Sequence, residues 1–455
     1  TQQETLFPYT TLFRSRAPER LVERSAEQRA RLAALNPCYR AFAHPASDLE
    51  ARADRLAEEL RGRRYRGLLH GVTVGIKGCV PVAGLPWTEG CASYEDRVAA
   101  TDAAIVADLE RAGAVVLGMT TLSELAMYAP DNPFEPMGLN PWDPTRTAGG
   151  SSTGAAVGAA LGLGDLHIGT DSGGSVRNPA CHCGVVGFMP SDGRLSREGL
   201  IDRTPSLTRV GLVARGVDDV RLATQVLAKL PPPLAPGVET LLVPAALVAR
   251  TADAATRELF EATMAGLQRA GWSFALAEIP HWAEAEAAAG VVSLAETAAH
   301  LSDADLRAAG PRVVARHAQG MGLDPAAVAA AREHCRAFAA ALEATLEAHR
   351  ATAVLTPTWP FAAPPIEAET VDLDGRTVPL DPHRNIYVRA ANAAGATAIT
   401  LPAAVYPDAE VPFGVHLMAP AGADTALLDV AARIERVLGW QVLPPPVVAS
   451  SGGEP

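Results

Sequence analysis

The fold is decided by residues 147–190, which read TAGGSSTGAAVGAALGLGDLHIGTDSGGSVRNPACHCGVVGFMP. Two clusters of glycine and serine stand in this stretch, GGSS at 149–152 and GGS at 173–175. Between them, the small residues of 153–163 predict a helix and the apolar run 166–169 predicts a short strand. Glycine lets a ligand approach backbone amides closely, and a serine hydroxyl becomes a nucleophile once a base takes its proton. Since one helix and one strand join the clusters, they can meet in space and form a site.

Other meanings of such clusters fit less well. No Lys-Ser or Lys-Thr follows either cluster, as a phosphate-binding loop requires, and neither cluster has the spacing G-x-S-x-G of a nucleophile elbow. None of the 11 histidines is spaced so as to indicate a Ser-His-Asp triad. The alternative is that both clusters are purely structural, as glycine-rich turns at the ends of a buried helix.

The two clusters together resemble the amidase signature family of C–N hydrolases. The resemblance rests on GGSS and, 24 residues after its first serine, the second serine of GTDSGGSVR, and it extends from about residue 37 to residue 440. It implies an α/β fold in which a large, mixed, twisted β-sheet is covered by helices on both faces, with a helical variable insert. The alternation of helix and strand patterns before residue 190 independently predicts an α/β sheet.

The resemblance implies a catalytic set of Lys77 as base, Ser151 as bridging serine and Ser175 as nucleophile. The residues support the first assignment, because only two of the 39 basic residues are lysines and Lys77 ends an apolar, glycine-containing strand pattern at 68–77. Arginine stays protonated at any working pH, whereas a buried lysine can be neutral. The alternative is a lysine that extends from a strand edge to solvent. The family also has a cis peptide bond before the bridging serine, here between Gly150 and Ser151.

The resemblance assigns the oxyanion hole to the backbone amides of Ser172, Gly173 and Gly174, since consecutive glycine-rich amides can form an anion-binding nest. It assigns four further residues to support and orientation: Gly150, Ser152, Asp171 and Arg177. No cofactor and no metal are expected. The run CHC at 181–183 could suggest a metal site, but its ligands are too close together and have no partner pair elsewhere.

Composition limits the class of protein. The 455 residues are 48% hydrophobic, which is ample for a large core, and the net charge of −12 excludes a basic nucleic-acid footprint over the whole chain. The six cysteines show no regular spacing, and we find neither an apolar run near 20 residues nor a secretory signal. We therefore expect a cytoplasmic enzyme, monomer or homodimer, that acts on a small molecule without membrane or nucleic-acid partners.

One domain is predicted for residues 16–445. Residues 1–15 match nothing in the family and are interpreted as a non-native or disordered extension, and 446–455 as a disordered tail. The alanine-rich stretch 251–350 is predicted to be the helical variable region. Strand patterns at 354–358, 396–402 and 413–418 and a helix pattern at 424–438 correspond to the closing segments of the family.

The proline-rich loop at 130–146 is long enough to line a pocket. Its apolar and aromatic residues and those just before it suit apolar ligands, and its acids would repel an anion. The expected substrate is therefore a neutral, largely apolar or aryl amide or carbamate, as for an aryl acylamidase or a urethanase. The alternative is that these side chains are core packing under the loop. The predicted pocket residues are Met127, Tyr128, Phe134, Met137 and Trp142.

Two other functions remain open. One is the glutaminase component, or A subunit, of a glutamyl-tRNA amidotransferase, which releases ammonia from glutamine; Asn178 stands where that component usually has Gln, and the helical insert looks unrelated. The other is a non-catalytic binding protein on the same fold, against which the retention of all three catalytic residue types argues.

Overall fold

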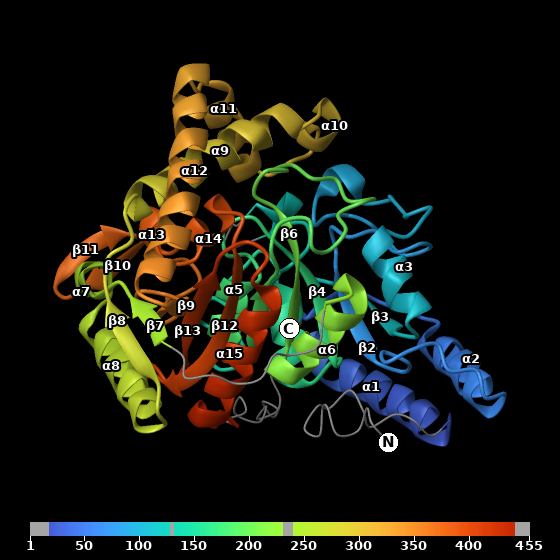
Figure 1. Cartoon of the computed structure of the whole chain (residues 1–455). Coiled ribbons are helices and arrows are strands. Elements are labelled where there is room, and N and C mark those ends of the chain that lie inside the picture. The colour runs from blue at the N-terminus through green and yellow to red at the C-terminus, as the bar shows by residue number, and fades with distance from the viewer. Residues whose placement is uncertain (1–17, 128–131, 231–239, 442–455) are drawn as a thin grey trace.

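The computed structural model of the chain describes residues 18–127, 132–230 and 240–441 (Figure 1). Tyr128 and the predictions for 1–15 and 446–455 lie outside these ranges. The centre of the molecule is a single mixed sheet of eleven strands. In spatial order the strands are β1 (Phe42–Pro45), β3 (Val115–Thr120), β2 (Thr73–Lys77), β4 (Leu166–Asp171), β6 (Arg209–Ala214), β5 (Val186–Met189), β12 (Thr397–Val405), β13 (Pro412–Ala419), β9 (Ala351–Pro357), β7 (Thr240–Val243) and β8 (Ser273–Leu276).

Parallel pairing is confined to two parts of this sheet. Strand β2 runs parallel to both β3 and β4, and β7 runs parallel to both β8 and β9. The strands between these groups pair antiparallel, for example β12 with β5 and with β13. The carboxyl ends of β2 and β4 therefore meet at the same edge of the sheet, which matters for the site because Lys77 and Asp171 end these strands.

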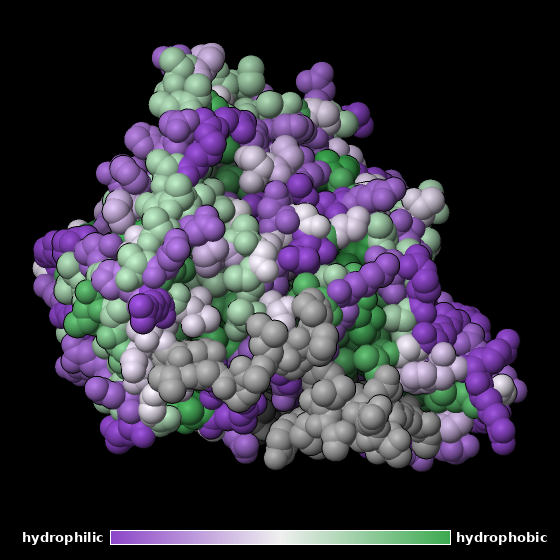
Figure 2. Space-filling model, in the orientation of Figure 1, coloured by the Kyte–Doolittle hydropathy of each residue, from purple (hydrophilic) through white to green (hydrophobic). Residues whose placement is uncertain are grey.

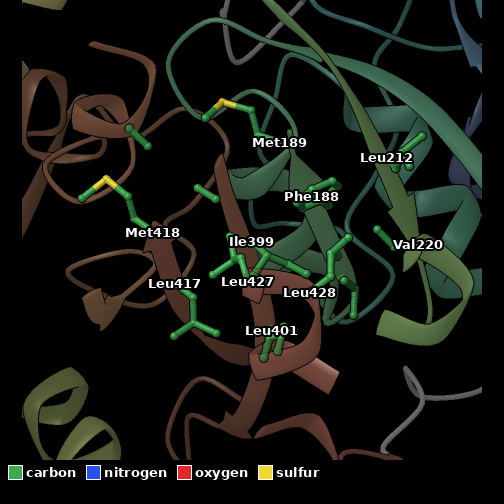
Figure 3. Close-up of a cluster of buried hydrophobic side chains, with 14 of the residues drawn as sticks. Phe188, Met189, Leu212, Val220, Ile399, Leu401, Leu417, Met418, Leu427 and Leu428 are labelled. Carbon is green, nitrogen blue, oxygen red and sulfur yellow. The ribbon is translucent and has the colours of Figure 1, made fainter. Parts of the chain in front are cut away.

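Helices cover both faces of the sheet, because successive side chains of a strand point to opposite faces. Leu212 of β6 packs in one buried cluster with Leu427 and Leu428 of α15 (Asp424–Leu438), and its neighbour Val213 packs in another with Val157 of α4 (Thr153–Leu161). Figure 3 shows the first cluster, between β5, β6, β12 and β13 and the helices α6 (Val217–Ala228) and α15. The predicted α/β fold with a two-sided sheet is confirmed.

The remaining helices surround this core. They are α1 (Pro18–Tyr39), α2 (Leu49–Arg61), α3 (Ala104–Arg111), α5 (Arg177–Cys183), α7 (Ala245–Thr251), α8 (Ala254–Arg269), α9 (Trp282–His300), α10 (Asp303–Leu306), α11 (Pro311–Met321), α12 (Pro325–Ala348), α13 (Leu380–His383) and α14 (Arg389–Ala393). A separate hairpin is formed by β10 (Thr370–Leu373) and β11 (Arg376–Pro379). Figure 1 shows α9, α10, α11 and α12 together at the top of the molecule. On the face shown in Figure 2, hydrophilic and hydrophobic residues are intermixed, and the light green residues over α12 reflect its many alanines.

The stretch 251–350 is not wholly helical, so this prediction is wrong in one place. Residues Ser273–Leu276 form β8, an edge strand that pairs in parallel with β7. Leu276 is 67% exposed, and none of the four residues of the strand is buried. A four-residue edge strand between two helices leaves no periodic signal, because its apolar residues are not required to face a core.

Candidate active site

Lys77 is fixed at the carboxyl end of β2, beside the end of β4. Ile76 pairs with Ile168 across these parallel strands, which brings the next residues of both strands to one edge. The Lys77 ammonium nitrogen lies 2.7 Å from Ser151 Oγ and 2.8 Å from Thr170 Oγ1. The lysine side chain is fully buried, and among the described residues no carboxylate forms an ion pair with it. The amine is therefore surrounded by hydroxyl groups.

This environment favours the neutral amine. Burial lowers the pKa of Lys77 from 10.5 to about 8, and only weaker interactions with Cys79 and Asp171 act in the other direction. At pH 7.5 such a shift raises the neutral fraction from roughly one in a thousand to roughly one in four. A neutral amine can accept a proton from the hydroxyl that it contacts, which is what a general base must do.

The two glycine-serine clusters meet, as expected. The Ser152 amide donates a hydrogen bond to the Ser175 carbonyl at 3.0 Å, and Ser152 Oγ bonds to the backbone of Thr170, donating to its carbonyl at 3.2 Å and accepting from its amide at 3.3 Å. The Gly150–Ser151 peptide bond is cis, which confirms that prediction. Ser151 is buried, whereas Ser175 is partly exposed. The order from interior to surface is therefore Lys77, Ser151 and Ser175.

A buried ion pair shapes the loop that carries Ser175. Arg177 and Asp171 are both fully buried, and the guanidinium donates to both carboxylate oxygens, at 2.9 and 3.0 Å. Burial alone would raise the pKa of Asp171, but the charge and hydrogen bonds of Arg177 and the bonds from Asn392 and the Val176 amide outweigh it and hold the pKa well below its usual range. Through Asp171, this pair is joined to the Gly174 and Val176 amides on either side of Ser175.

Arg177 also ties this loop to the carboxyl-terminal part of the chain. It donates to the Val388 carbonyl at 2.7 Å, to Asn392 Oδ1 at 2.6 Å and to His416 Nε2 at 2.9 Å. Burial and the neighbouring Arg177 lower the pKa of His416 far below its ordinary value, so the ring is neutral and can accept this bond. Every N–H group of the Arg177 guanidinium is thus hydrogen-bonded within the protein.

One predicted oxyanion donor is already occupied. The Gly174 amide donates to Asp171 Oδ1 at 2.7 Å, so it is not available to a substrate and that assignment needs correction. Within the described ranges, the amides of Ser172, Gly173 and Ser175 have no hydrogen-bond partner. The physical reason is that the Asp171 carboxylate accepts from the turn that follows it, at Gly174 and Val176. Ser172 and Gly173 remain candidates for the oxyanion hole.

A pocket opens at Ser175. The catalytic loops contribute Gly150, Thr170, Ser172, Gly173 and Ser175 to its lining. Residues of α9 and α11 and residues around α13 and α14 also line it, and several of them are arginines. The charged residues of the lining are Asp202, Arg203, Arg316, Arg384 and Arg389. Of the helices at the top of Figure 1, α9 and α11 contribute residues to this lining.

Most of the predicted apolar pocket residues lie elsewhere. Met127 is part of the lining, but Phe134, Met137 and Trp142 are not. The Trp142 ring packs against Trp440 with centroids 5.9 Å apart, and its indole N–H donates to the Cys183 carbonyl at 3.0 Å. This part of the loop is therefore packed against the protein body, which corresponds to the alternative of core packing.

Most residues of the pocket lining were not predicted from the sequence, among them Thr170, Arg316 and Arg389. Thr170 contacts Lys77 through its side chain, and its position one residue before Asp171 at the end of a parallel neighbouring strand would have been a usable signal. Arg316 and Arg389 come from helices distant in sequence, and no local pattern marks them.

The run CHC at 181–183 makes packing contacts. His182 packs edge-on against Trp359 with ring centroids 4.2 Å apart, and Cys183 Sγ lies 3.7 Å from the Ala148 carbonyl. No group of three or more His, Cys, Asp or Glu within 18–127, 132–230 and 240–441 is arranged to hold a metal ion. In the same ranges, no helix has the length and apolar character that crossing a membrane would need.

The chain is similar to several known proteins. The family model Amidase matches residues 23–236 and 241–428. The Mycobacterium tuberculosis protein described as putative amidase AmiD is 40% identical over 188 residues, which are 41% of this chain and 39% of AmiD, so the match spans about two fifths of that relative's length. The A subunit of the glutamyl-tRNA(Gln) amidotransferase of Thermus thermophilus is 32% identical over 84% of this chain and 88% of its own length. A crystal structure of an amidase superposes with a TM-score of 0.85 at 28% identity, over 92% of this chain and 96% of that one.

Proposed function

The chain belongs to the amidase signature family, and from this premise we propose that it is a serine hydrolase that cleaves amide C–N bonds through an acyl-enzyme intermediate. The observation that carries the proposal is the buried contact of 2.7 Å between Lys77 Nζ and Ser151 Oγ. It places a lysine with a pKa lowered to about 8 beneath a pocket into which Ser175 opens. Such a lysine can act as a base, because part of it is neutral at working pH.

The proposed reaction has two steps. Lys77 takes the proton of Ser151 while Ser151 takes that of Ser175, and Ser175 Oγ attacks the carbonyl carbon of the amide. The C–N bond breaks, the leaving nitrogen takes up the proton through the same hydroxyl, and the acyl group stays on Ser175 as an ester. Water then attacks the ester by the same proton route, which releases the carboxylic acid and restores the serine. The amides of Ser172 and Gly173 are proposed to stabilise the negative charge on the carbonyl oxygen.

This chemistry suits amides and also carbamates, since both have a carbonyl next to a nitrogen leaving group. The narrower aryl or urethane substrate predicted from the loop at 130–146 lacks support from the pocket lining, because Trp142 and its neighbours pack elsewhere. We keep carbamates and anilides as substrates to be assayed beside aliphatic amides.

A second candidate is glutamine hydrolysis within a tRNA-dependent amidotransferase. It is favoured by the Thermus thermophilus relative, which aligns with most of this chain. A glutaminase assay of the protein alone, and again with the other components of such an amidotransferase, tests this candidate. Ammonia release only in the presence of those components would favour it over a free-standing amidase.

Reaction with a fluorophosphonate probe tests the proposed nucleophile. We expect one covalent adduct, located at Ser175 by peptide mass spectrometry, and hydrolysis of at least one compound in the amide and carbamate panel. The Ser175→Ala variant should lose both while keeping its circular dichroism spectrum and melting temperature, because a methyl group replaces a hydroxyl with little change in volume. A binding protein without catalytic function would give no adduct and no turnover, and residual activity of the variant above a tenth of wild type would exclude Ser175 as nucleophile.

A further inference from the structure

The charged residues of the pocket at Ser175 are paired, with one exception. Arg203 forms ion pairs with Glu89 and Asp305, and Asp202 is held by Arg197 at 2.7 Å. Arg389 donates to Glu286 at 2.8 Å, and Arg384 is paired with Asp381. Each of these charged residues thus has an oppositely charged partner within the protein.

Arg316 is the exception. It lies on α11 and lines the pocket, and no ion pair or hydrogen bond joins its side chain to another residue in the described ranges. Its Nε atom is buried without a partner. Leaving a charged donor unpaired in a partly buried place is costly, and proteins usually avoid it unless a ligand completes the site.

The arginines Arg384 and Arg389 increase this cost. Burial and the charges of both neighbours lower the pKa of Arg316, which shows that their like charges act on the same region. Asp381, the one acid that opposes this effect, already pairs with Arg384. An anion bound at Arg316 would relieve the repulsion, whereas a neutral group would leave it in place.

The cationic side of the pocket also reaches the catalytic loop. A methyl group on Gly173 would lie 3.5 Å from Arg389 Nε, and one on Gly290 of α9 would lie 3.3 Å from Arg389 Nη1. The Arg389 side chain therefore lies against the glycine two residues before Ser175. A substrate with its carbonyl at Ser175 therefore lies close to Arg389, and Arg316 lines the same pocket.

We propose that the amide hydrolysed here carries a carboxylate a few bonds from the scissile carbonyl, and that Arg316 binds this carboxylate. The inference rests on the proposed hydrolase function and specifies its substrate class. A planar guanidinium binds a carboxylate through two parallel hydrogen bonds, and one uncompensated positive charge matches one carboxylate better than a doubly charged phosphate. This class replaces the neutral substrate expected from the loop at 130–146.

The first test compares substrates that differ only in charge. The wild-type protein is assayed with succinamate and glutaramate and with the neutral diamides succinamide and glutaramide, by ammonia release. We expect kcat/KM for one of the acids to exceed that of its diamide by roughly tenfold to a hundredfold, as for a charged hydrogen bond. The Arg316→Gln variant should lose most of this ratio, mainly through KM, and Arg316→Lys should retain part of it.

The control removes the same charge outside the pocket. Arg307 is exposed and follows α10, so Arg307→Gln should leave the ratio at its wild-type value. Preference for the diamides, or an unchanged ratio in Arg316→Gln, would overturn the inference while the hydrolase proposal stands.

The second test does not depend on turnover. Binding of succinamate and glutaramate to the Ser175→Ala variant is measured by isothermal titration calorimetry, with and without Arg316→Gln. We expect saturable binding of at least one acid that weakens by about tenfold or more in the double variant. If wild type hydrolyses none of the amides, the hydrolase proposal is contradicted. The role of Arg316 is still decided by the binding measurement, which needs no turnover. Equal binding by both variants, or no binding, would overturn that role.

Discussion

The burial of Lys77 should be measurable as a cost to stability that depends on pH. The perturbation is Lys77→Met, which keeps an unbranched side chain of similar length and removes the amine. In wild type the amine is fully buried and its pKa is lowered from 10.5 to about 8. Since the unfolded chain holds this proton more tightly than the folded one, the lysine destabilises the fold wherever the unfolded amine is charged.

The size of this effect follows from the two pKa values. The cost is greatest below the folded pKa, at about 3 kcal/mol, and it falls by about 1.4 kcal/mol for each pH unit between about 8 and 10.5. Between pH 7 and pH 10 the unfolding free energy of wild type should therefore rise by about 2.5 kcal/mol relative to Lys77→Met. The hydrogen bonds to Ser151 and Thr170 that the variant loses shift the difference between the two proteins but not its slope with pH.

Urea denaturation of both proteins at pH 7, 8, 9 and 10, followed by circular dichroism, measures this slope. The matched control is Lys229→Met, since Lys229 is exposed and is the chain's other lysine. The unfolding free energy of Lys229→Met should change with pH in parallel with that of wild type. A difference between wild type and Lys77→Met that stays constant within about 0.5 kcal/mol over this range would refute a lowered lysine pKa, and with it the proposed base.

Three further outcomes are expected. The value of kcat/KM should rise with pH through an apparent pKa near 8, which belongs to the coupled Lys77–Ser151–Ser175 set. The Lys77→Arg variant should be as inactive as Lys77→Ala, because arginine keeps its proton. Activity in Lys77→Arg would rule out proton transfer to this residue. Thr170→Val removes a hydroxyl that accepts a bond from the lysine, so the midpoint of the pH–rate profile should move to lower pH, and an unmoved midpoint would contradict this. Arg177→Met leaves the Asp171 carboxylate buried without its partner and should lower the unfolding free energy by about 3–5 kcal/mol in urea denaturation, whereas a loss below about 1 kcal/mol would show that the pair is dispensable.

The central part of the site could be predicted because it is local in sequence. The residues from GGSS to GGS form one helix and one strand, and the contacts between Ser152, Thr170 and Ser175 stay within this stretch. Lys77 could be added because lysine is rare in this chain and its strand pattern is apolar. The pairing of β2 with β4 then brings Lys77 to the same edge, as parallel neighbours must.

The substrate side of the pocket could not be predicted, since it depends on packing between distant segments. Trp142 is of a residue type that often lines pockets, but here its ring packs against Trp440 and its indole N–H donates to the Cys183 carbonyl. Arg316 lies on one face of a helix in the variable region, and only the tertiary structure turns that face toward Ser175. The orientation of the Gly174 amide could not be predicted either, because it is set by its acceptor, the Asp171 carboxylate, and not by the glycine itself.

The bonds of Arg177 have a consequence for how the protein is made. The ribosome delivers the chain from its amino terminus, so Lys77, Ser151 and Ser175 all emerge long before Val388, Asn392 and His416, which accept bonds from this guanidinium. Val388 and Asn392 follow the Ser175 loop by more than 200 residues, and His416 is added only with β13. A chain that ends before Val388 would hold every residue proposed for catalysis and would lack all three of these acceptors. The Ser175 loop therefore receives the last of its supporting bonds from His416 in β13, one of the final segments of the chain to be made.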